Sequence, residues 1–137
     1  MKIEPYLNFD GRCDEAIEFY KGAVGARVIR LLRFKDMPGN PPGGEFPREN
    51  LEKVMHANLL IGETHVLVSD GRCGGKGAFA GVTLSLTVAG DAEAARLFAA
   101  LGEGGKVTMP LAKTFFASSF GMLTDRFGVA WMIVAEH

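Results

Sequence analysis

The sequence of 137 residues has little cysteine and histidine, and neither is arranged as a reactive or metal-binding motif. The two cysteines, Cys13 and Cys73, are too few and too far apart for a zinc ribbon or a redox CxxC pair. Cysteine usage of this kind is typical of reduced thiols in a cytoplasmic protein. The three histidines form no HxH or HExxH pattern, so no tight ligand spacing indicates a metal.

Charge of one sign and long apolar runs are lacking as well. Fifteen basic residues face 16 acidic ones, for a net charge of −1, and the two signs are interspersed. This balance argues against nucleic acid or an anionic membrane as a partner. The apolar runs are too short to span a bilayer, and the N-terminus lacks the apolar core of a signal peptide. The hydrophobic content of 47% is ordinary for one folded domain.

Hydrophobic periodicity predicts the same order of elements twice. The expected strands are residues 3–9, 26–34, 51–61, 64–70, 81–88, 106–111, 118–124 and 129–134, and the expected helices are residues 12–24 and 92–101. Gly25 is expected to end the first helix and Asp91 to cap the second. The pattern predicts an α+β fold of two βαβββ modules, residues 1–72 and 78–137.

The two halves also repeat in register. Phe19-Tyr20 corresponds to Leu97-Phe98 at an offset of 78 residues, and residues 25–28 correspond to residues 104–107 at an offset of 79. A repeated unit that cannot bury its apolar face alone must pack against its copy. The repeat therefore indicates two modules within one domain.

The most informative stretch is the predicted closing hairpin. Residues 120–124 and 129–134 form its arms, and residues 125–128 form a turn that Asp125 opens and Gly128 closes with a positive φ. Other matching motifs are Lys53-Val54-Met55-His56-Ala57, Ser69-Asp70-Gly71 and Thr108-Met109-Pro110-Leu111.

With these motifs, the chain resembles the vicinal oxygen chelate superfamily of glyoxalases, extradiol dioxygenases and fosfomycin or bleomycin resistance proteins. It is most similar to the PhnB-like branch, also labelled 3-demethylubiquinone-9 3-methyltransferase-like. The resemblance runs over residues 5–134 and implies a glyoxalase-like fold, in which two modules form a half-open sheet around a cavity. A homodimer is expected, because a half-open sheet leaves edges and apolar faces to cover.

The same resemblance predicts that the superfamily's metal site is absent and that no cofactor is bound. Its ligand positions fall on Pro5, Thr83 and Met132, and on an apolar residue among 66–68. None of these side chains is a good ligand for a divalent cation. The alternative is a relocated metal built from His56 and Asp70, with His65 as a neighbour across the hairpin. That site would serve a metal-dependent lyase, dioxygenase or resistance-type enzyme.

Without a metal, the cavity itself is the candidate site, with apolar residues Ile3, Pro5, Leu7 and Phe9 as one wall. The hydroxyls of residues 83–87 would form the other wall, which suits a small, mostly uncharged organic molecule. The candidate ligand-binding residues are His56, Asp70, Thr83, Ser85, Thr87, Phe116 and Trp131.

Each candidate also has a structural interpretation. Asp70 and Asp125 would cap turns, and His56 would be a hydrogen-bonded histidine of the core or an interface. Phe116 and Trp131 would pack in the core or a dimer interface, and the hydroxyls would line a solvated face. The favoured hypothesis is a small-molecule-binding protein or degenerate enzyme. The second hypothesis is the metal-dependent enzyme with a relocated site, and the third is a structural or interaction protein whose cavity is vestigial.

The sequence does not decide the role of two segments that are rich in glycine or proline. Residues 36–50 would be a lid, a dimer contact or a disordered excursion. Residues 71–77 do not fit the GxxxxGK[ST] phosphate loop, so no nucleotide site is predicted there. No glycine-rich turn joins a first strand to a helix in the Rossmann-like manner, which argues against a methyltransferase.

Overall fold

A computed structural model describes residues 1–37, 48–71 and 78–136 of the chain, in which the predicted βαβββ order occurs twice. The chain divides into two compact units, Met1–Gly77 and Ala78–His137. No helix among the described residues is long and apolar enough to cross a membrane. The α+β class and the repeated βαβββ order expected from the sequence are confirmed.

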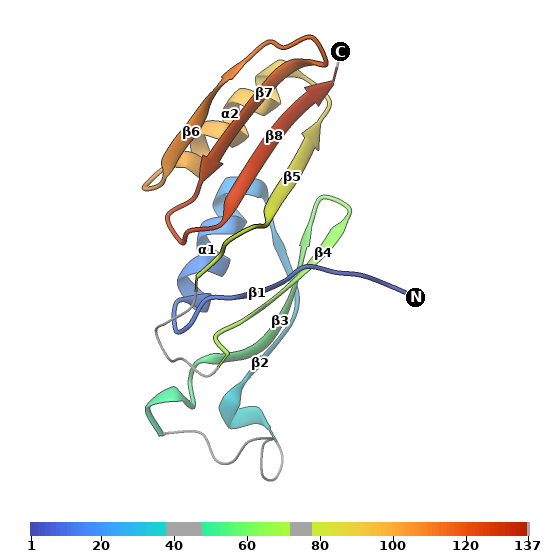
Figure 1. Cartoon of the computed structure of the whole chain (residues 1–137). Coiled ribbons are helices and arrows are strands. Elements are labelled where there is room, and N and C mark those ends of the chain that lie inside the picture. The colour runs from blue at the N-terminus through green and yellow to red at the C-terminus, as the bar shows by residue number, and fades with distance from the viewer. Residues whose placement is uncertain (38–47, 72–77, 137) are drawn as a thin grey trace. The chain divides into compact units, whose positions relative to one another are not determined.

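The first unit is a four-stranded sheet with one long helix (Figure 1). The strands lie in the order β1-β4-β3-β2, with β1 parallel to β4 and the other pairs antiparallel. Its elements are β1 (Tyr6–Asn8), α1 (Cys13–Val24), β2 (Arg27–Arg33), η1 (Phe34–Asp36), η2 (Arg48–Asn50), β3 (Val54–Ile61) and β4 (Thr64–Ser69).

The second unit has the same topology, with the strands in the order β5-β8-β7-β6. Again the first strand runs parallel to the last, and the other pairs are antiparallel. Its elements are β5 (Thr83–Val88), α2 (Asp91–Gly102), β6 (Lys106–Ala112), β7 (Ala117–Thr124) and β8 (Ala130–Glu136).

Each helix covers one face of its own sheet. The α1 residues at helical spacing, from Cys13 to Tyr20, are buried, and the helix ends at Gly25 in the left-handed conformation (φ 67°), as predicted. In the second unit α2 contacts β7 and β8. A Cβ on Gly121 would lie 2.7 Å from the Phe98 ring, so only glycine permits this close approach of β7 to α2.

Three expectations about local structure are wrong. The first strand begins at Tyr6, not at residue 3, and Leu7 and Phe9 point into the core on the side of α1 instead of forming an apolar wall. Ile3 is 92% exposed. Asp91 is the first residue of α2 and not its cap, because the capping position is Gly90. The Asp91 carboxylate instead accepts hydrogen bonds from the hydroxyls of Ser118 and Ser119, both at 2.6 Å.

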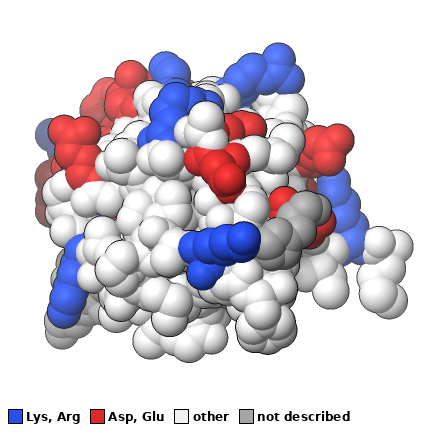
Figure 2. All heavy atoms as spheres, turned by 90° about the horizontal axis from the view of Figure 1, so that it is seen from above, with Lys and Arg blue, Asp and Glu red and all other residues white. Residues whose placement is uncertain are grey.

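The surface agrees with the balanced composition. Figure 2 shows Lys and Arg side chains interspersed with Asp and Glu side chains over one face of the molecule. Several of these charges form pairs within the first unit, such as Lys35 with Glu52 at 2.9 Å.

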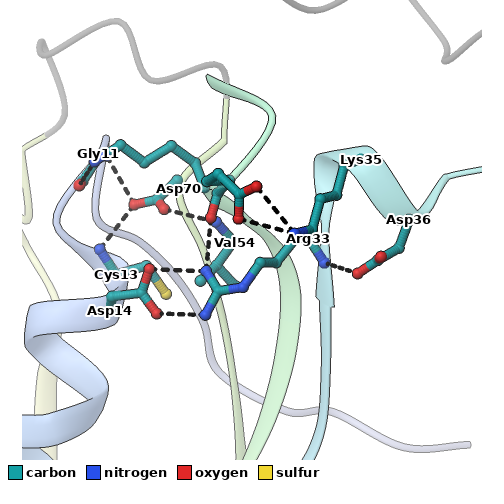
Figure 3. A network of polar contacts seen from close by, with 10 residues as sticks. Gly11, Cys13, Asp14, Arg33, Lys35, Asp36, Val54 and Asp70 are labelled. Atoms are coloured by element: carbon teal, nitrogen blue, oxygen red, sulfur yellow. Dashed lines mark hydrogen bonds and ion pairs between the residues drawn. The ribbon is translucent and has the colours of Figure 1, made fainter. Parts of the chain in front are cut away.

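Arg33 links β2 to α1 and to the turn that precedes β3. Its guanidinium donates two hydrogen bonds from β2 to the carboxylate of Asp14 on α1, at 2.9 and 3.0 Å, and one to the carbonyl of Glu52 (Figure 3). The bond to Asp14 is the main cause that raises the pKa of Arg33 above its ordinary value. Bidentate geometry of this kind fixes the orientation of the helix on the sheet.

We expect Arg33→Gln to lower the free energy of unfolding by only about 0.5–1 kcal/mol, because the Asp14 side chain is 55% exposed and solvent screens the pair. Urea unfolding of the two proteins at low and high salt would measure this. A loss well above that range, unchanged by salt, would contradict the weak, screened interaction.

Candidate functional site

The face of the second sheet that points away from α2 carries a row of one serine and three methionines, with one residue from each strand. Strand register brings Ser85 level with Met132, Met132 level with Met122, and Met122 level with Met109. Residues that lie directly opposite one another in a sheet point to the same face. Ser85, Met132, Met122 and Met109 therefore cross the whole sheet from edge to edge, and we call them the methionine row.

Two further rows flank the methionine row on this open face. One contains Thr83, Ala130, Thr124 and Lys106, and the other contains Thr87, Val134, Phe120 and Ala112. The β5 hydroxyls form the exposed edge, and the β7 and β8 side chains are partly exposed. The Ser85 hydroxyl lies 3.9 Å from the sulfur of Met132.

Aromatic rings border this surface. The Phe116 ring meets the Phe120 ring edge to face, with 5.1 Å between centroids, and Phe115 meets Phe116 in the same edge-to-face manner at 5.2 Å. Phe115 is 96% exposed. The open face thus combines polarizable thioethers, aromatic rings and a line of hydroxyls. Methionine side chains adapt to ligands of varied shape, and the hydroxyls can orient a polar group.

The structure places four of the seven candidate ligand-binding residues at this surface. They are Thr83, Ser85, Thr87 and Phe116. Trp131 points to the opposite face and is buried under α2, where its indole donates to the carboxylate of Asp125 at 2.9 Å. Trp131 therefore packs in the core and does not line the open face, as one of the two interpretations from the sequence had it.

Asp70 is fully buried and serves the backbone. One carboxylate oxygen accepts from the amides of Gly11 and Cys13 at 2.7 and 2.8 Å, and the other accepts from Val54 at 2.9 Å (Figure 3). Asp70 therefore has no exposed surface for a ligand. Its expected role in a cavity is replaced by a cap on the N-terminus of α1, supplied from the end of β4.

The proposed relocated metal set is not assembled. Nδ1 of His56 forms a hydrogen bond with the hydroxyl of Tyr6, at 3.0 Å, and Nδ1 of His65 forms one with the side-chain oxygen of Asn58, at 2.8 Å. Strand register sets the two histidines four residues apart along the hairpin, about 13 Å, so they are not cross-strand neighbours. Among the described residues no three His, Cys, Asp or Glu side chains are grouped as metal ligands.

The superfamily's ligand positions do not fit a divalent metal in this chain. Thr83 and Met132 point to the open face of the second sheet but lie in different rows. Pro5 precedes β1, and Tyr6 is the first exposed strand residue after it. A hydroxyl and a thioether are poor ligands for a hard or borderline divalent cation. No chemical step through a metal is derived from these residues.

Sequence reasoning missed three residues of this surface, Met109, Met122 and Phe120. The spacing of Phe120 and Met122 along β7 was visible in the sequence, but the alignment of the four strands, which brings Met109 of β6 beside them, was not. Two register shifts within the β6–β7 pairing displace Met109 by one position relative to simple alternation. The Gly-rich segment 72–77 and residues 38–47 of the long loop lie outside the described residues.

Comparison with known proteins supports the fold over the whole chain. The family model described as 3-demethylubiquinone-9 3-methyltransferase matches residues 1–134. Protein YjdN of Escherichia coli (strain K12) is 36% identical over 141 residues, covering 97% of this chain and 94% of that protein.

Three solved structures are similar as well. PA1353 of Pseudomonas aeruginosa has a TM-score of 0.85 at 44% identity and covers 99% of this chain and 98% of that one. A putative 3-demethylubiquinone-9 3-methyltransferase, PhnB protein, of Bacillus cereus has a TM-score of 0.78 at 26% identity, with 98% and 99% covered. A glyoxylase/bleomycin resistance protein/dioxygenase domain of Frankia sp. EAN1pec shares the fold, with a TM-score of 0.67 at 15% identity over 100% of this chain and 98% of that one.

Proposed function

Since the chain belongs to the 3-demethylubiquinone-9 3-methyltransferase family, within the vicinal oxygen chelate superfamily, we propose that it is a small-molecule-binding protein of glyoxalase-like fold. The ligand is a small, mostly uncharged organic molecule, and the open face of the second sheet binds it. The observation that carries this proposal is the methionine row, which begins at the hydroxyl edge of β5 and runs beside the row that contains Phe120, the ring that Phe116 contacts.

The chemistry of this surface supports binding more than catalysis. Thioethers and aromatic rings remove apolar ligand surface from water, which stabilises a complex by about 25 cal/mol for each Å² buried. The hydroxyls of Thr83, Ser85 and Thr87 can donate and accept, so they would orient a carbonyl or hydroxyl group. None of these side chains is a general base or an activated nucleophile by itself.

The family description names a methyltransferase, but the strand-to-helix turn of the first unit is not free to hold a cofactor. The amides of Gly11 and Cys13, at the start of α1, are already bonded by the carboxylate of Asp70. A helix N-terminus binds an anionic group through such amides. At the start of α1 the Asp70 carboxylate therefore occupies the amides that would otherwise bind an acidic group of a cofactor.

A pair of residues on β6 tests the binding surface. Met109 and Val107 are both 46% exposed, but strand register points Met109 to the methionine row and pairs Val107 with Leu123 on the side of α2. We expect Met109→Ser to weaken binding of an uncharged fluorescent probe, N-phenyl-1-naphthylamine, about five-fold, which corresponds to about 1 kcal/mol of lost apolar contact. Val107→Ser is the matched control and should bind as the parent does.

Fluorescence titration measures this directly. Failure of the parent protein to bind the probe, together with no thermal stabilisation by a library of uncharged small molecules, would overturn the proposal, because a ligand of the native state must raise its melting temperature. Equal weakening by the two variants would place binding elsewhere. The homodimer and the cytoplasmic location expected from the sequence stay predictions, and light scattering of the purified protein tests the first.

A further inference from the structure

The first sheet has its own open face, away from α1, and it differs in chemistry from the open face of the second sheet. Strand register brings Arg30 level with Asn58, and Asn58 level with Leu67 and then Tyr6. A neighbouring row contains Arg27, Leu60 and His65, and on the other side Leu32 lies level with His56. Side chains level with one another point to the same face. Polar and basic groups therefore predominate here.

A β-bulge brings the two arginines to this one face. Residues three apart on a regular strand point to opposite faces, so Arg27 and Arg30 would normally diverge. Here Val28 pairs with Leu59 and Arg30 pairs with the very next residue, Asn58, so Ile29 is an extra residue in β2. Bulges re-aim side chains in this way. The two arginines end up level with β3 residues that are two apart, about 7 Å along the strand.

Both guanidinium groups are available. Within the ranges that the structure describes, neither Arg27 nor Arg30 forms an ion pair or hydrogen bond through its side chain, and both residues are exposed. By contrast, Arg12 and Arg33 each bind a carboxylate. Glu4, which precedes β1, lies 3.5 Å from the ammonium of Lys2 and so has its own counter-charge.

The neighbouring histidine adds a donor. Nδ1 of His56 is engaged by the Tyr6 hydroxyl at 3.0 Å, so Nε2 is the ring nitrogen left to meet a ligand. In the tautomer in which the Tyr6 hydroxyl donates to Nδ1, Nε2 carries the ring proton and is a donor. Tyr6 and His56 also hold each other in place, with ring centroids 5.6 Å apart.

We propose that the open face of the first sheet binds an oxyanion, with Arg27 and Arg30 as the principal ligands and His56 as an additional donor. A planar guanidinium can donate two parallel hydrogen bonds to two oxygens of a carboxylate or phosphate group. Two guanidinium groups on one face therefore bind such an anion more strongly than two positive charges that lack this geometry. This site lies in the first unit and takes a charged ligand, so it goes beyond the binding of an uncharged molecule proposed for the second unit. Either of these two proposals can be wrong while the other holds.

The site is tested by titrating the protein with inorganic phosphate and with succinate. Binding is monitored through the NMR signals of the backbone amides, at low ionic strength and again at about 0.15 M salt. We expect chemical shift changes on β2 and β3 with at least one anion. Arg27→Gln and Arg30→Gln should each weaken binding about ten-fold. Arg96→Gln, an exposed position on α2, removes the same charge from the second unit and should leave the affinity unchanged.

The outcomes separate the sources of the anion. Tighter binding of phosphate indicates a phosphorylated ligand, and tighter binding of succinate indicates an organic acid. Shift changes without the ten-fold loss in either arginine variant, or an equal loss in Arg96→Gln, would overturn the proposal and indicate general charge attraction. No binding of either anion at low ionic strength would overturn it as well. None of these results depends on whether the second sheet binds N-phenyl-1-naphthylamine.

Discussion

Asp70→Ala is expected to lower the free energy of unfolding by about 3–6 kcal/mol, because it leaves two buried amides and one partly buried amide without an acceptor, at a cost of about 1–3 kcal/mol for each buried one and less for the third. Asp70 is fully buried, and its two oxygens accept from Gly11, Cys13 and Val54. A whole domain is stable by only about 5–15 kcal/mol, so the variant could lose much of its stability. The melting temperature should fall by roughly 10–20 °C in a calorimetric scan.

Two further variants show whether the missing acceptors cause this effect. Asp70→Asn keeps the shape and one acceptor oxygen but turns an NH₂ group toward an amide donor, so we expect an intermediate loss of about 2 kcal/mol. Glu18→Ala removes a carboxylate from the exposed surface of α1 and should change stability by no more than about 0.5 kcal/mol. If Asp70→Ala is no worse than Glu18→Ala, the carboxylate does not hold the three amides as the structure shows.

Asp125 and Trp131 are expected to show strong energetic coupling in a double-mutant cycle. One Asp125 oxygen accepts from the amides of Phe127 and Val129 at 2.9 and 3.0 Å, and the other accepts from the indole of Trp131. We expect losses of about 3 kcal/mol for Asp125→Ala and about 2 kcal/mol for Trp131→Phe. The double variant should lose about 1–2 kcal/mol less than their sum, because the shared bond is counted twice.

Urea unfolding followed by circular dichroism gives the four free energies of this cycle. A second pair, Asp125→Ala with Glu18→Ala, serves as the control and should be additive, since the Glu18 carboxylate is exposed on α1 and pairs with Lys21. Additivity within the Asp125–Trp131 cycle would contradict the buried hydrogen bond. It would then leave Asp125 as a turn residue alone.

The closing hairpin shows how much of the fold can be predicted from the sequence. The Asp-Arg-Phe-Gly turn was predicted from local chemistry, and the structure confirms it, with the Gly128 amide bonded to the Asp125 carbonyl. The helices and most strands were predicted to within a few residues because their apolar residues recur at fixed spacing. The start of β1 was placed too early, since Ile3 extends the apolar pattern of the sequence but is exposed and lies outside the strand.

The candidate site could be predicted less well, because its residues meet through strand register. The alternation of β5 was enough to place Thr83, Ser85 and Thr87 on one face, as observed. Nothing local showed that Met109 and Met122 would come level with Met132, or that an extra residue at Ile29 would align two arginines. Similarly, the indole bond of Trp131 to Asp125 depends on a contact across the hairpin that the sequence pattern does not fix.

The cap on α1 has a consequence for how the first module folds. The helix begins at Cys13, but the carboxylate that binds its first amide belongs to a residue 57 positions later in the chain. During synthesis the helix is therefore made long before its cap exists, and closing such a loop costs entropy that must be recovered elsewhere. Contacts of this sequence separation slow folding. The start of α1 should thus become ordered late, together with the end of β4, and a nascent chain that stops at the β3–β4 turn should keep this end of the helix frayed.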